Sequence, residues 1–307
     1  MLLVILCTGA ACAGLFTYYY TSSQTFHDTV KAVMTHADTP SQAFPNQNEI
    51  NVLLMGRDLD RDPHGRVLHT TRGRTDAIML AHIDFRNNRV NILSIPRDTL
   101  VRVPGYRGKR RINSANALGG PELAQDTVAD FLGVTPDYYA LLDFDAFVKT
   151  IDGIGGLRLT VDKQLDYDDS WGNLHIHLTP GNQQLNGTQA MGFVRYRHAN
   201  GGGGDSDLVR ISRQQELLAA FKAKMSNPVV LLKFPHILDK VRGDLQGNLS
   251  MNQLVCLARF LKSVPPGTGV KMATVPDTGK SRVYVKPDTD ATKELVDSMF
   301  HSAHYLH

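Results

Sequence analysis

The sequence predicts an α/β protein in which helices sandwich a central mixed β-sheet, behind an N-terminal transmembrane anchor. Short apolar runs typical of buried strands recur along the chain, helical patterns alternate with them, and the first twenty residues carry no charge. At 307 residues with 42% hydrophobic content, the chain is long enough to bury a full core.

The N-terminal run MLLVILCTGAACAGLFTYYY predicts the anchor. Twenty helical residues at ~1.5 Å each reach roughly 30 Å, the thickness of a bilayer core. A signal peptide is the competing reading, and neither reading has the basic residue that usually precedes such a run. We therefore expect an anchor over residues 1–20, a polar stalk over 21–48 and one folded catalytic domain over 49–303.

The domain opens with three apolar runs of strand type, at 50–56, 75–84 and 90–96, and two more follow at 138–144 and 157–162. Helical patterns lie between and after them. The first is bounded by Pro121 and Gly133, residues that suit the start and the end of a helix. The expected helices are 121–133, 145–152, 187–194, 207–225, 229–241, 250–263 and 289–302.

Several classes of protein are disfavoured by what the sequence lacks. The net charge of +3 is too small for a nucleic-acid footprint, and no helix-turn-helix candidate carries a basic recognition helix. There is no G-x-x-x-x-G-K-[ST], no G-x-G-x-x-G and no G-x-S-x-G, so nucleotide, dinucleotide and serine-hydrolase functions lack their signatures. Beyond the anchor Cys256 is the only cysteine, which leaves no disulfide framework there.

The segment FVRYRHANGGGGDSDLVRISRQQ, residues 193–215, concentrates guanidinium groups around a four-glycine run. Arg195 and Arg197 are two apart and share one side of an extended chain, whereas Arg210 and Gln214 are four apart and share a helix face. A guanidinium group is planar and permanently charged, and it can donate two parallel hydrogen bonds to a pair of phosphate oxygens. This segment therefore predicts a phosphate or diphosphate ligand. A solvated helix face is the alternative.

Four further clusters mix arginine with carboxylate or amide where strands begin or end: Gly56–Asp58, Gly73–Asp76, Pro96–Thr99 and Arg111–Asn113. Open α/β sheets bind ligands at such edges. Taken singly, each cluster is most often a structural salt bridge. Taken together, they supply enough carboxylates to hold Mg²⁺ or Mn²⁺ through oxygen ligands and enough arginines to hold a diphosphate beside it.

The order of GRD, GRTDAIML, IPRDT, RINSANALGG, IDGIGGLRLTVD, HLTPGNQQLNGTQAMGFVRYRH and DSDLVRISRQQ resembles the LytR-CpsA-Psr family over about residues 50–225. The resemblance implies a membrane-anchored phosphotransferase. Such an enzyme takes a glycopolymer from a polyprenyl-pyrophosphate carrier and attaches it by a phosphodiester to peptidoglycan outside the membrane.

The resemblance also implies roles for particular residues. Asp58 and Asp76 would bind Mg²⁺, and Asp98 or Asp76 would accept the proton of the sugar hydroxyl. The glycine run Gly201–Gly204 departs from the family's usual loop. The residues expected around the diphosphate are Arg74, Arg97, Arg111, Arg195, Arg197, Arg210 and Gln214, of which Arg97, Arg195 and Arg197, with Asp98, are the expected catalytic set.

A lipid carrier needs an apolar groove for its chain. Residues on the 121–154 helices are candidates, although apolar side chains at helical spacing form ordinary core more often than a lipid site. The candidate lining is Leu123, Val128, Phe131, Phe147, Val148, Ile151 and Ile154.

The predicted function is therefore that of an extracytoplasmic transferase with a single membrane pass. Its expected partners are a polyprenyl-pyrophosphate-linked glycan, a peptidoglycan acceptor and the membrane, with no nucleic acid. A polyprenyl-pyrophosphate phosphatase, in which water is the acceptor, would use the same pocket. A membrane-bound regulator that senses lipid phosphates is a further alternative.

Overall fold

The computed structural model describes residues 39–57, 73–169, 174–196 and 207–225, part of 227–244, and residues 245–265, 268–280 and 284–300. The predicted anchor and most of the predicted stalk lie outside these ranges, as do Asp58 and Arg197. No helix within them is long and apolar enough to span a bilayer.

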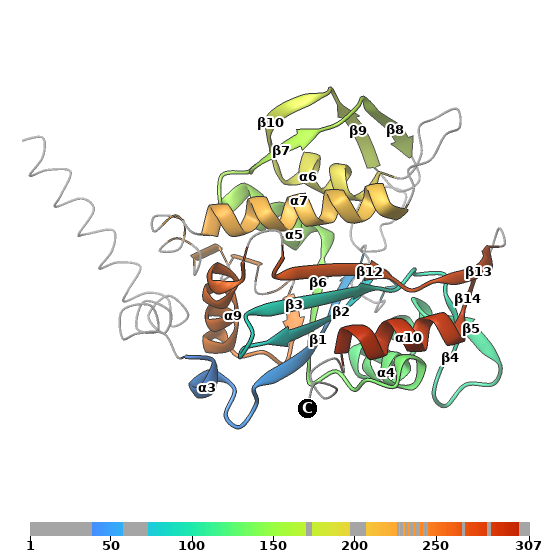
Figure 1. Ribbon diagram of the computed structural model, residues 1–307. Helices are drawn as coiled ribbons and strands as arrows, with labels where there is room; N and C mark the ends of the chain where they lie inside the picture. The colour runs from blue at the N-terminus through green and yellow to red at the C-terminus, as the bar shows by residue number, and fades with distance from the viewer. Residues whose placement is uncertain are drawn as a thin grey trace, which may run out of the picture.

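The centre of the protein is a six-stranded sheet with the order β11-β6-β1-β2-β3-β12 (Figure 1). Strand β1 is parallel to β6, and β3 is parallel to β12. Strand β2 is antiparallel to both of its neighbours, and β11 is antiparallel to β6. The predicted mixed sheet is thus confirmed. Its strands are β1 (Glu49–Arg57), β2 (Thr75–Asp84), β3 (Arg89–Ser94), β6 (Tyr138–Asp143), β11 (Leu245–Gly247) and β12 (Val270–Thr274).

One face of the sheet is sealed by helices α4 (Ser114–Leu132) and α10 (Thr289–Phe300). Leu53, Leu80 and Leu93 on this face are fully buried and pack with residues of both helices. Helix α4 is two helices joined at Gly120, whose φ of 85° is readily available only to glycine. Pro121 starts the second half, where its missing N–H leaves no hydrogen bond unmade.

The opposite face packs against α9 (Met251–Ser263), the short α3 (Pro40–Ala43) and α7 (Asp207–Met225). Phe260 of α9 and Phe44, which follows α3, cover the part of this face where β1 begins and β2 ends. The sheet is less covered toward the other end of β1. Leu54 on β1 and its register partner Met79 on β2 are only partly buried there.

A smaller unit lies above the sheet and contains α5 (Phe144–Gly153), α6 (Gly187–Arg195) and α7, with two pairs of strands (Figure 1). It has its own apolar cluster, which includes Leu157, Leu185 and Phe193. Helix α7 forms the side of this unit that faces the sheet, since it contacts β7 as well as β12. The paired strands are β7 (Leu157–Val161) with β10 (Gly181–Leu185), and β8 (Leu165–Asp169) with β9 (Leu174–Leu178).

Two short hairpins extend from one side of the sheet (Figure 1). Strand β4 (Leu100–Arg102) pairs with β5 (Lys109–Arg111), and β13 (Asp277–Lys280) pairs with β14 (Val285–Pro287). Val285 links the second hairpin to the segment just before β4, because its N–H donates to the carbonyl of Asp98 at 2.8 Å.

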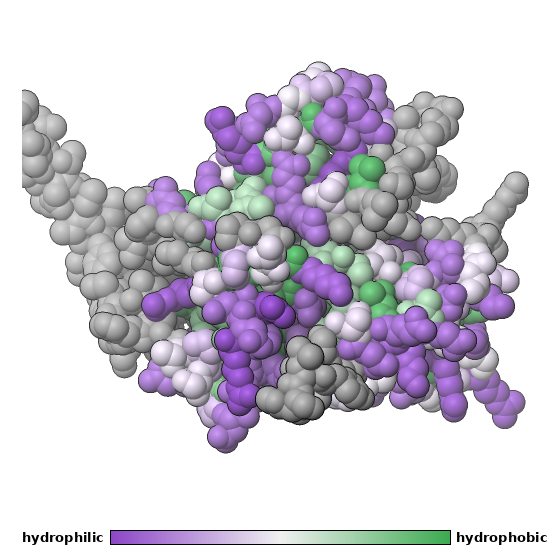
Figure 2. All heavy atoms as spheres, viewed as in Figure 1, coloured by the Kyte–Doolittle hydropathy of each residue, from purple (hydrophilic) through white to green (hydrophobic). Residues whose placement is uncertain are grey.

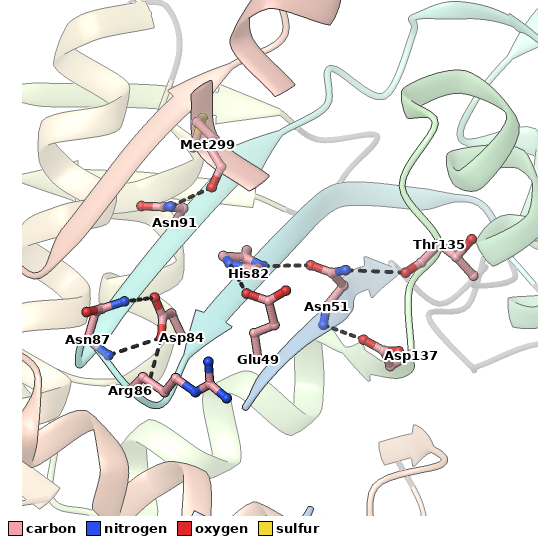
Figure 3. Close-up of polar contacts among 10 residues, drawn as sticks. All are labelled: Glu49, Asn51, His82, Asp84, Arg86, Asn87, Asn91, Thr135, Asp137 and Met299. Atoms are coloured by element: carbon pink, nitrogen blue, oxygen red, sulfur yellow. Dashed lines mark hydrogen bonds and ion pairs between the residues drawn. The ribbon is translucent and has the colours of Figure 1, made fainter. Parts of the chain in front are cut away.

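Polar side chains fasten the end of the sheet where β1 begins (Figure 3). The imidazole of buried His82 meets Asn51 Oδ1 at 3.0 Å, and Asn51 Nδ2 reaches the Thr135 carbonyl at 3.5 Å. Asn91 Nδ2 donates to the Met299 carbonyl at 2.6 Å, which ties the last turn of α10 to β3. The buried imidazole of His82 therefore has a hydrogen-bond partner, as buried polar groups generally do.

Candidate active site

The parallel strands β1, β3 and β6 all end at the same edge of the sheet, where β2 begins. Arg57, the last residue of β1, is the register partner of Asp143 on β6 and of Thr75 on β2. Three of the sequence clusters are therefore brought together at one edge, as predicted from the positions at which the strands end.

Asp76 occupies a β-bulge at this edge. Gly56 pairs with Ala77, whereas the next residue, Arg57, pairs with Thr75, so Asp76 is the additional residue on β2. A bulge breaks the alternation of side chains and can turn one of them in a new direction. The bulge sets the direction of a carboxylate that the sequence singles out.

Carboxylates and guanidinium groups then form a chain across three segments. Arg97 Nη1 donates to Asp76 Oδ1 at 2.8 Å, and Arg97 Nε donates to Asp98 Oδ2 at 3.4 Å. Arg111 Nη1 lies 3.5 Å from Asp98 Oδ1. These contacts orient the four side chains. Each side chain is between 21% and 40% exposed, so a ligand can still reach all of them.

Backbone hydrogen bonds fix the loops that carry this chain. The Asn113 N–H donates to the Arg97 carbonyl at 3.1 Å, and the Thr75 N–H donates to the Asn113 carbonyl at 3.3 Å. Asn113 thus links the segments that bear Asp76, Arg97 and Arg111.

The charge of Arg97 is secured by its surroundings. Partial burial would lower the pKa of this guanidinium, but the carboxylates of Asp76 and Asp98 outweigh that effect and raise its pKa above the ordinary value. A ligand bound here therefore meets a fixed positive charge at every physiological pH.

A second, more deeply buried ion pair lies beside the first group. Arg57 binds both carboxylate oxygens of Asp143, and the two side chains are only 12% and 5% exposed. Asp143 is also the N-cap residue of α5, yet its carboxylate makes no cap and serves Arg57 instead. Sequence reasoning missed Asp143. Its position directly after an apolar strand, like that of Asp58, was the available signal.

Arg195 reaches the same region from helix α6. Its guanidinium lies 4.4 Å from the ring centroid of Phe144, the residue that follows Asp143. Phe144 in turn packs over Gly56, where an added Cβ would come within 3.2 Å of its ring. Stacking on the Phe144 ring holds the planar guanidinium group of Arg195 in place.

Two features fix where helix α6 begins and how closely it packs on α5. Asn186 and Gln189 form a capping box at its start. Gly187 sits so close to α5 that a Cβ would lie 2.3 Å from the Val148 carbonyl oxygen, so only glycine allows this approach.

The other predicted ligand residues fall in different places. Arg74 is exposed just before β2, and Gln214 is partly buried on α7. The structure places the backbone of Arg210 in the first turn of α7 but does not describe its side chain. The neighbouring Arg213 is only 4% exposed, bonds Asp162 at 3.2 Å and stacks on Tyr196, so it belongs to the upper core.

The seven predicted lipid-lining residues do not share one surface. Leu123, Val128 and Phe131 pack in the core between α4 and the sheet. Phe147, Ile151 and Ile154 pack in the core of the upper unit, and the backbone of Val148 abuts α6. This packing fits the alternative of ordinary core.

An apolar cleft instead lies between α7, α9 and β12, with a volume of about 520 Å³. Figure 2 shows hydrophobic residues at the surface between α7 and the edge strand β12, with hydrophilic residues above and below. Glu216 and Lys222 lie among its lining residues. Its apolar lining includes Leu218, Ala219, Leu261, Val264 and Val270. The lining residues lie within one stretch of the chain, from Gln215 to Val270, and the cleft depends on how α7, α9 and β12 pack together, which sequence periodicity does not reveal.

Asp76 has the chemistry of a magnesium ligand. Arg97 occupies its Oδ1, and no residue that the structure describes bonds its Oδ2. Within the same described ranges no three His, Cys, Asp or Glu side chains are grouped as a metal site. The second predicted ligand, Asp58, lies outside those ranges.

Comparison with known proteins gives relatives in both sequence and structure. Regulatory protein MsrR of Staphylococcus aureus (strain COL) is 35% identical over 206 residues, which cover 66% of this chain and 58% of MsrR. TagV of Bacillus subtilis (strain 168), a polyisoprenyl-teichoic acid–peptidoglycan teichoic acid transferase, is 30% identical over 223 residues, or 71% and 54%. The chain thus spans a little over half the length of these curated relatives.

Among solved structures, TagT bound to LIIa-WTA has a TM-score of 0.63 and 27% identity, and covers 84% of this chain and 91% of its own. The crystal structure of B. subtilis TagV has a TM-score of 0.64 at 24% identity, over 83% and 98% of the two chains, and supports the fold. The profile of the LytR_cpsA_psr family matches residues 15–301. The chain therefore belongs to the LytR-CpsA-Psr family.

Proposed function

We propose that this protein is an extracytoplasmic phosphotransferase that moves a glycopolymer from a polyprenyl-pyrophosphate carrier onto peptidoglycan. The observation that carries the proposal is the convergence of arginines from β1, the β3–β4 loop, β5 and α6 on one edge of the sheet. Those residues are Arg57, Arg97, Arg111 and Arg195. A dense, partly exposed set of guanidinium groups suits a diphosphate.

The relatives support the same proposal of a transferase. TagV is named as a teichoic acid transferase that acts on peptidoglycan, and TagT has been seen with LIIa-WTA. Both share the fold of this chain.

The proposed reaction is a displacement at phosphorus. A sugar hydroxyl of the acceptor attacks the phosphorus that bears the glycopolymer, a new P–O bond forms, and the bond to the polyprenyl phosphate breaks. Negative charge develops on the departing phosphate, where Arg97 and its neighbours would stabilise it. Asp98 and Asp76 are the two candidates to take the hydroxyl proton.

Mg²⁺ would be held by Asp58 and by Oδ2 of Asp76, and it would neutralise charge on the diphosphate when bound. Mn²⁺ has the same oxygen preference. Arg97 would keep the Asp76 carboxylate in one orientation for that role.

The polyprenyl chain would occupy the apolar cleft between α7, α9 and β12. Each methylene buried there contributes about 0.8 kcal/mol. Leu54 and Met79 are partly buried and belong to the same hydrophobic cluster as the cleft residue Val264, so they would extend the apolar surface from the cleft toward the arginines.

The decisive experiment incubates the full chain in detergent with a polyprenyl-pyrophosphate-linked glycan, Mg²⁺ and peptidoglycan. We expect polymer joined to peptidoglycan, together with free polyprenyl phosphate. Cleavage of the carrier at the same rate without peptidoglycan would identify a phosphatase instead. Absence of joined product with several carriers would reject the transferase.

MsrR, a relative named as a regulatory protein, gives one reason to keep a regulator as the second candidate. A regulator of transcription would need its C-terminal domain in the cytoplasm. Reporter fusions near residue 300 test this, because a transferase requires that the domain lies outside the membrane, with the chain crossing it once.

A further inference from the structure

The β8–β9 hairpin of the upper unit gathers two histidines and two aspartates that the candidate active site does not use (Figure 1). Asp166 pairs with His177 and Asp168 pairs with His175, so all four side chains project from the same face of the two strands. These side chains are between 45% and 61% exposed. The hairpin therefore presents two imidazoles and two carboxylates together to the solvent.

The opposite face of the hairpin fixes this arrangement. Leu165, Ile176 and Leu178 are each no more than 2% exposed and pack in the core of the upper unit. Successive side chains of a strand point to opposite faces. The core contacts of these three residues thus determine which face the polar side chains share.

A carboxylate from the neighbouring strand orients each imidazole. Nδ1 of His175 hydrogen-bonds Oδ1 of Asp168, and Nδ1 of His177 hydrogen-bonds Oδ1 of Asp166. An ionised carboxylate only accepts hydrogen bonds, so the proton in each pair is on Nδ1 and the neutral ring keeps its lone pair on Nε2. Metal-binding histidines generally have this arrangement, in which a carboxylate holds one ring nitrogen and the other nitrogen binds the metal.

The two imidazoles also lie close to each other. Oδ1 of Asp168 hydrogen-bonds His175 and lies 3.3 Å from Nε2 of His177, so a single carboxylate oxygen contacts both rings. This oxygen places negative charge beside a nitrogen that could bind a cation. Two nitrogen ligands, with water completing the coordination, are compatible with the finding that the described part of the chain has no group of three metal-binding side chains.

We propose that His175 and His177 form a binding site for a divalent transition-metal ion, and that Asp166 and Asp168 orient the two rings from the outer shell. Imidazole nitrogen suits Zn²⁺, Cu²⁺ and Ni²⁺, whereas Mg²⁺ and Ca²⁺ take oxygen ligands. The site therefore differs in chemistry from the Mg²⁺ position proposed at Asp76, and it does not depend on the proposed function. Because the rings come from β9 and the carboxylates from β8, a bound ion would tie the two strands together.

The test measures Zn²⁺ binding by isothermal titration calorimetry, with the full chain in detergent and without a polyhistidine tag. The pH is mildly alkaline, because the metal competes with a proton for Nε2. His175→Gln with His177→Gln removes both nitrogen ligands. His301→Gln with His304→Gln removes two histidines near the end of the chain and is the matched control.

We expect His175→Gln with His177→Gln to lose one equivalent of Zn²⁺ that the unaltered protein and the control both bind and that excess Mg²⁺ does not displace. Asp166→Asn with Asp168→Asn keeps both histidines and should bind this ion about 10- to 100-fold more weakly. Zn²⁺ should also slow hydrogen exchange in β8 and β9 of the unaltered protein. With a chelator present, the thermal midpoints of the two hairpin variants should stay close to that of the unaltered protein, because the substituted side chains are exposed.

Retention of that equivalent of Zn²⁺ in His175→Gln with His177→Gln would overturn the proposal, and so would its displacement by excess Mg²⁺. Its loss in Asp76→Asn, with the hairpin intact, would assign the ion to the active site and would also overturn the proposal. Unchanged affinity in Asp166→Asn with Asp168→Asn would reject the role given to the carboxylates.

Discussion

Arg97 is the residue on which the exposed part of the site depends, because it bonds Asp76 and Asp98 at once. Substituting it would remove a proposed phosphate ligand together with the hydrogen bonds that it donates to both carboxylates. Arg97→Ala should lower the rate of transfer by about 10²-fold or more, as the loss of a donor to a developing anion does elsewhere. Arg97→Lys should recover part of this rate, since it keeps the charge and loses the planar fork.

The thermal unfolding midpoint of Arg97→Ala is the control for folding, and it should change little. The side chain is 40% exposed, and exposed ion pairs contribute about 0–1 kcal/mol. Turnover near the unaltered value in Arg97→Ala would remove this residue from the site.

Arg57 and Asp143 should behave differently, because their pair is buried. Removing one partner leaves the other charge without compensation, so Arg57→Gln and Asp143→Asn should each lower the free energy of unfolding by about 3 kcal/mol. The double variant should lose much less than the sum. Urea denaturation of the four proteins measures this coupling, and simple additivity would show that the pair is not coupled.

At the scale of elements, the β8–β9 hairpin carries a pH-sensitive cluster. His177 faces Asp166 across the strands and also contacts Asp168, which pairs with His175. The hydrogen bond to Asp166 raises the pKa of His177, and the hydrogen bond to His175 lowers the pKa of Asp168.

The signs of these shifts define a window of stability. The contribution of His177 is complete below its unfolded pKa of about 6.5 and is lost as pH rises through the higher folded value; that of Asp168 is complete above about 4 and is lost in acid. Hydrogen-exchange protection of β8 and β9, corrected for intrinsic rates, should therefore be greatest between about pH 4 and 6.5. His177→Gln should remove the decline at higher pH, and an unchanged decline would contradict this assignment.

The elements also show what the sequence could reveal. Strand β2 has the predicted bounds of 75–84, because apolar residues on both of its faces leave a continuous signal. The hairpin β4–β5 was not predicted as a pair of strands, since exposed charged residues hide its alternation. The clusters at strand ends led to Asp76, Arg97 and Asp98, whereas Asp143 could not be paired with Arg57, 86 residues away, before the register was known.

At the scale of the whole molecule, the cleft and the arginine cluster should act as two separable binding regions. Ala219→Trp places a large side chain in the cleft between α7 and α9, where Ala219 is exposed. Transfer from a long polyprenyl carrier should fall about tenfold or more, while transfer from a two-isoprene carrier and binding of pyrophosphate should change little. Parallel losses for both carriers would mean that the chain of the lipid lies elsewhere.

The bulge at Asp76 makes the active edge depend on residue count as well as on residue type. If Thr75 were deleted, every guanidinium group and the Asp76 carboxylate would remain, and the ladder between β1 and β2 could close without interruption. The carboxylate would then return to the regular alternation and turn away from Arg97. A chain shortened in this way would keep its net charge, yet it would lose the contact between Asp76 and Arg97, so the arrangement of this edge is sensitive to single-residue insertions and deletions.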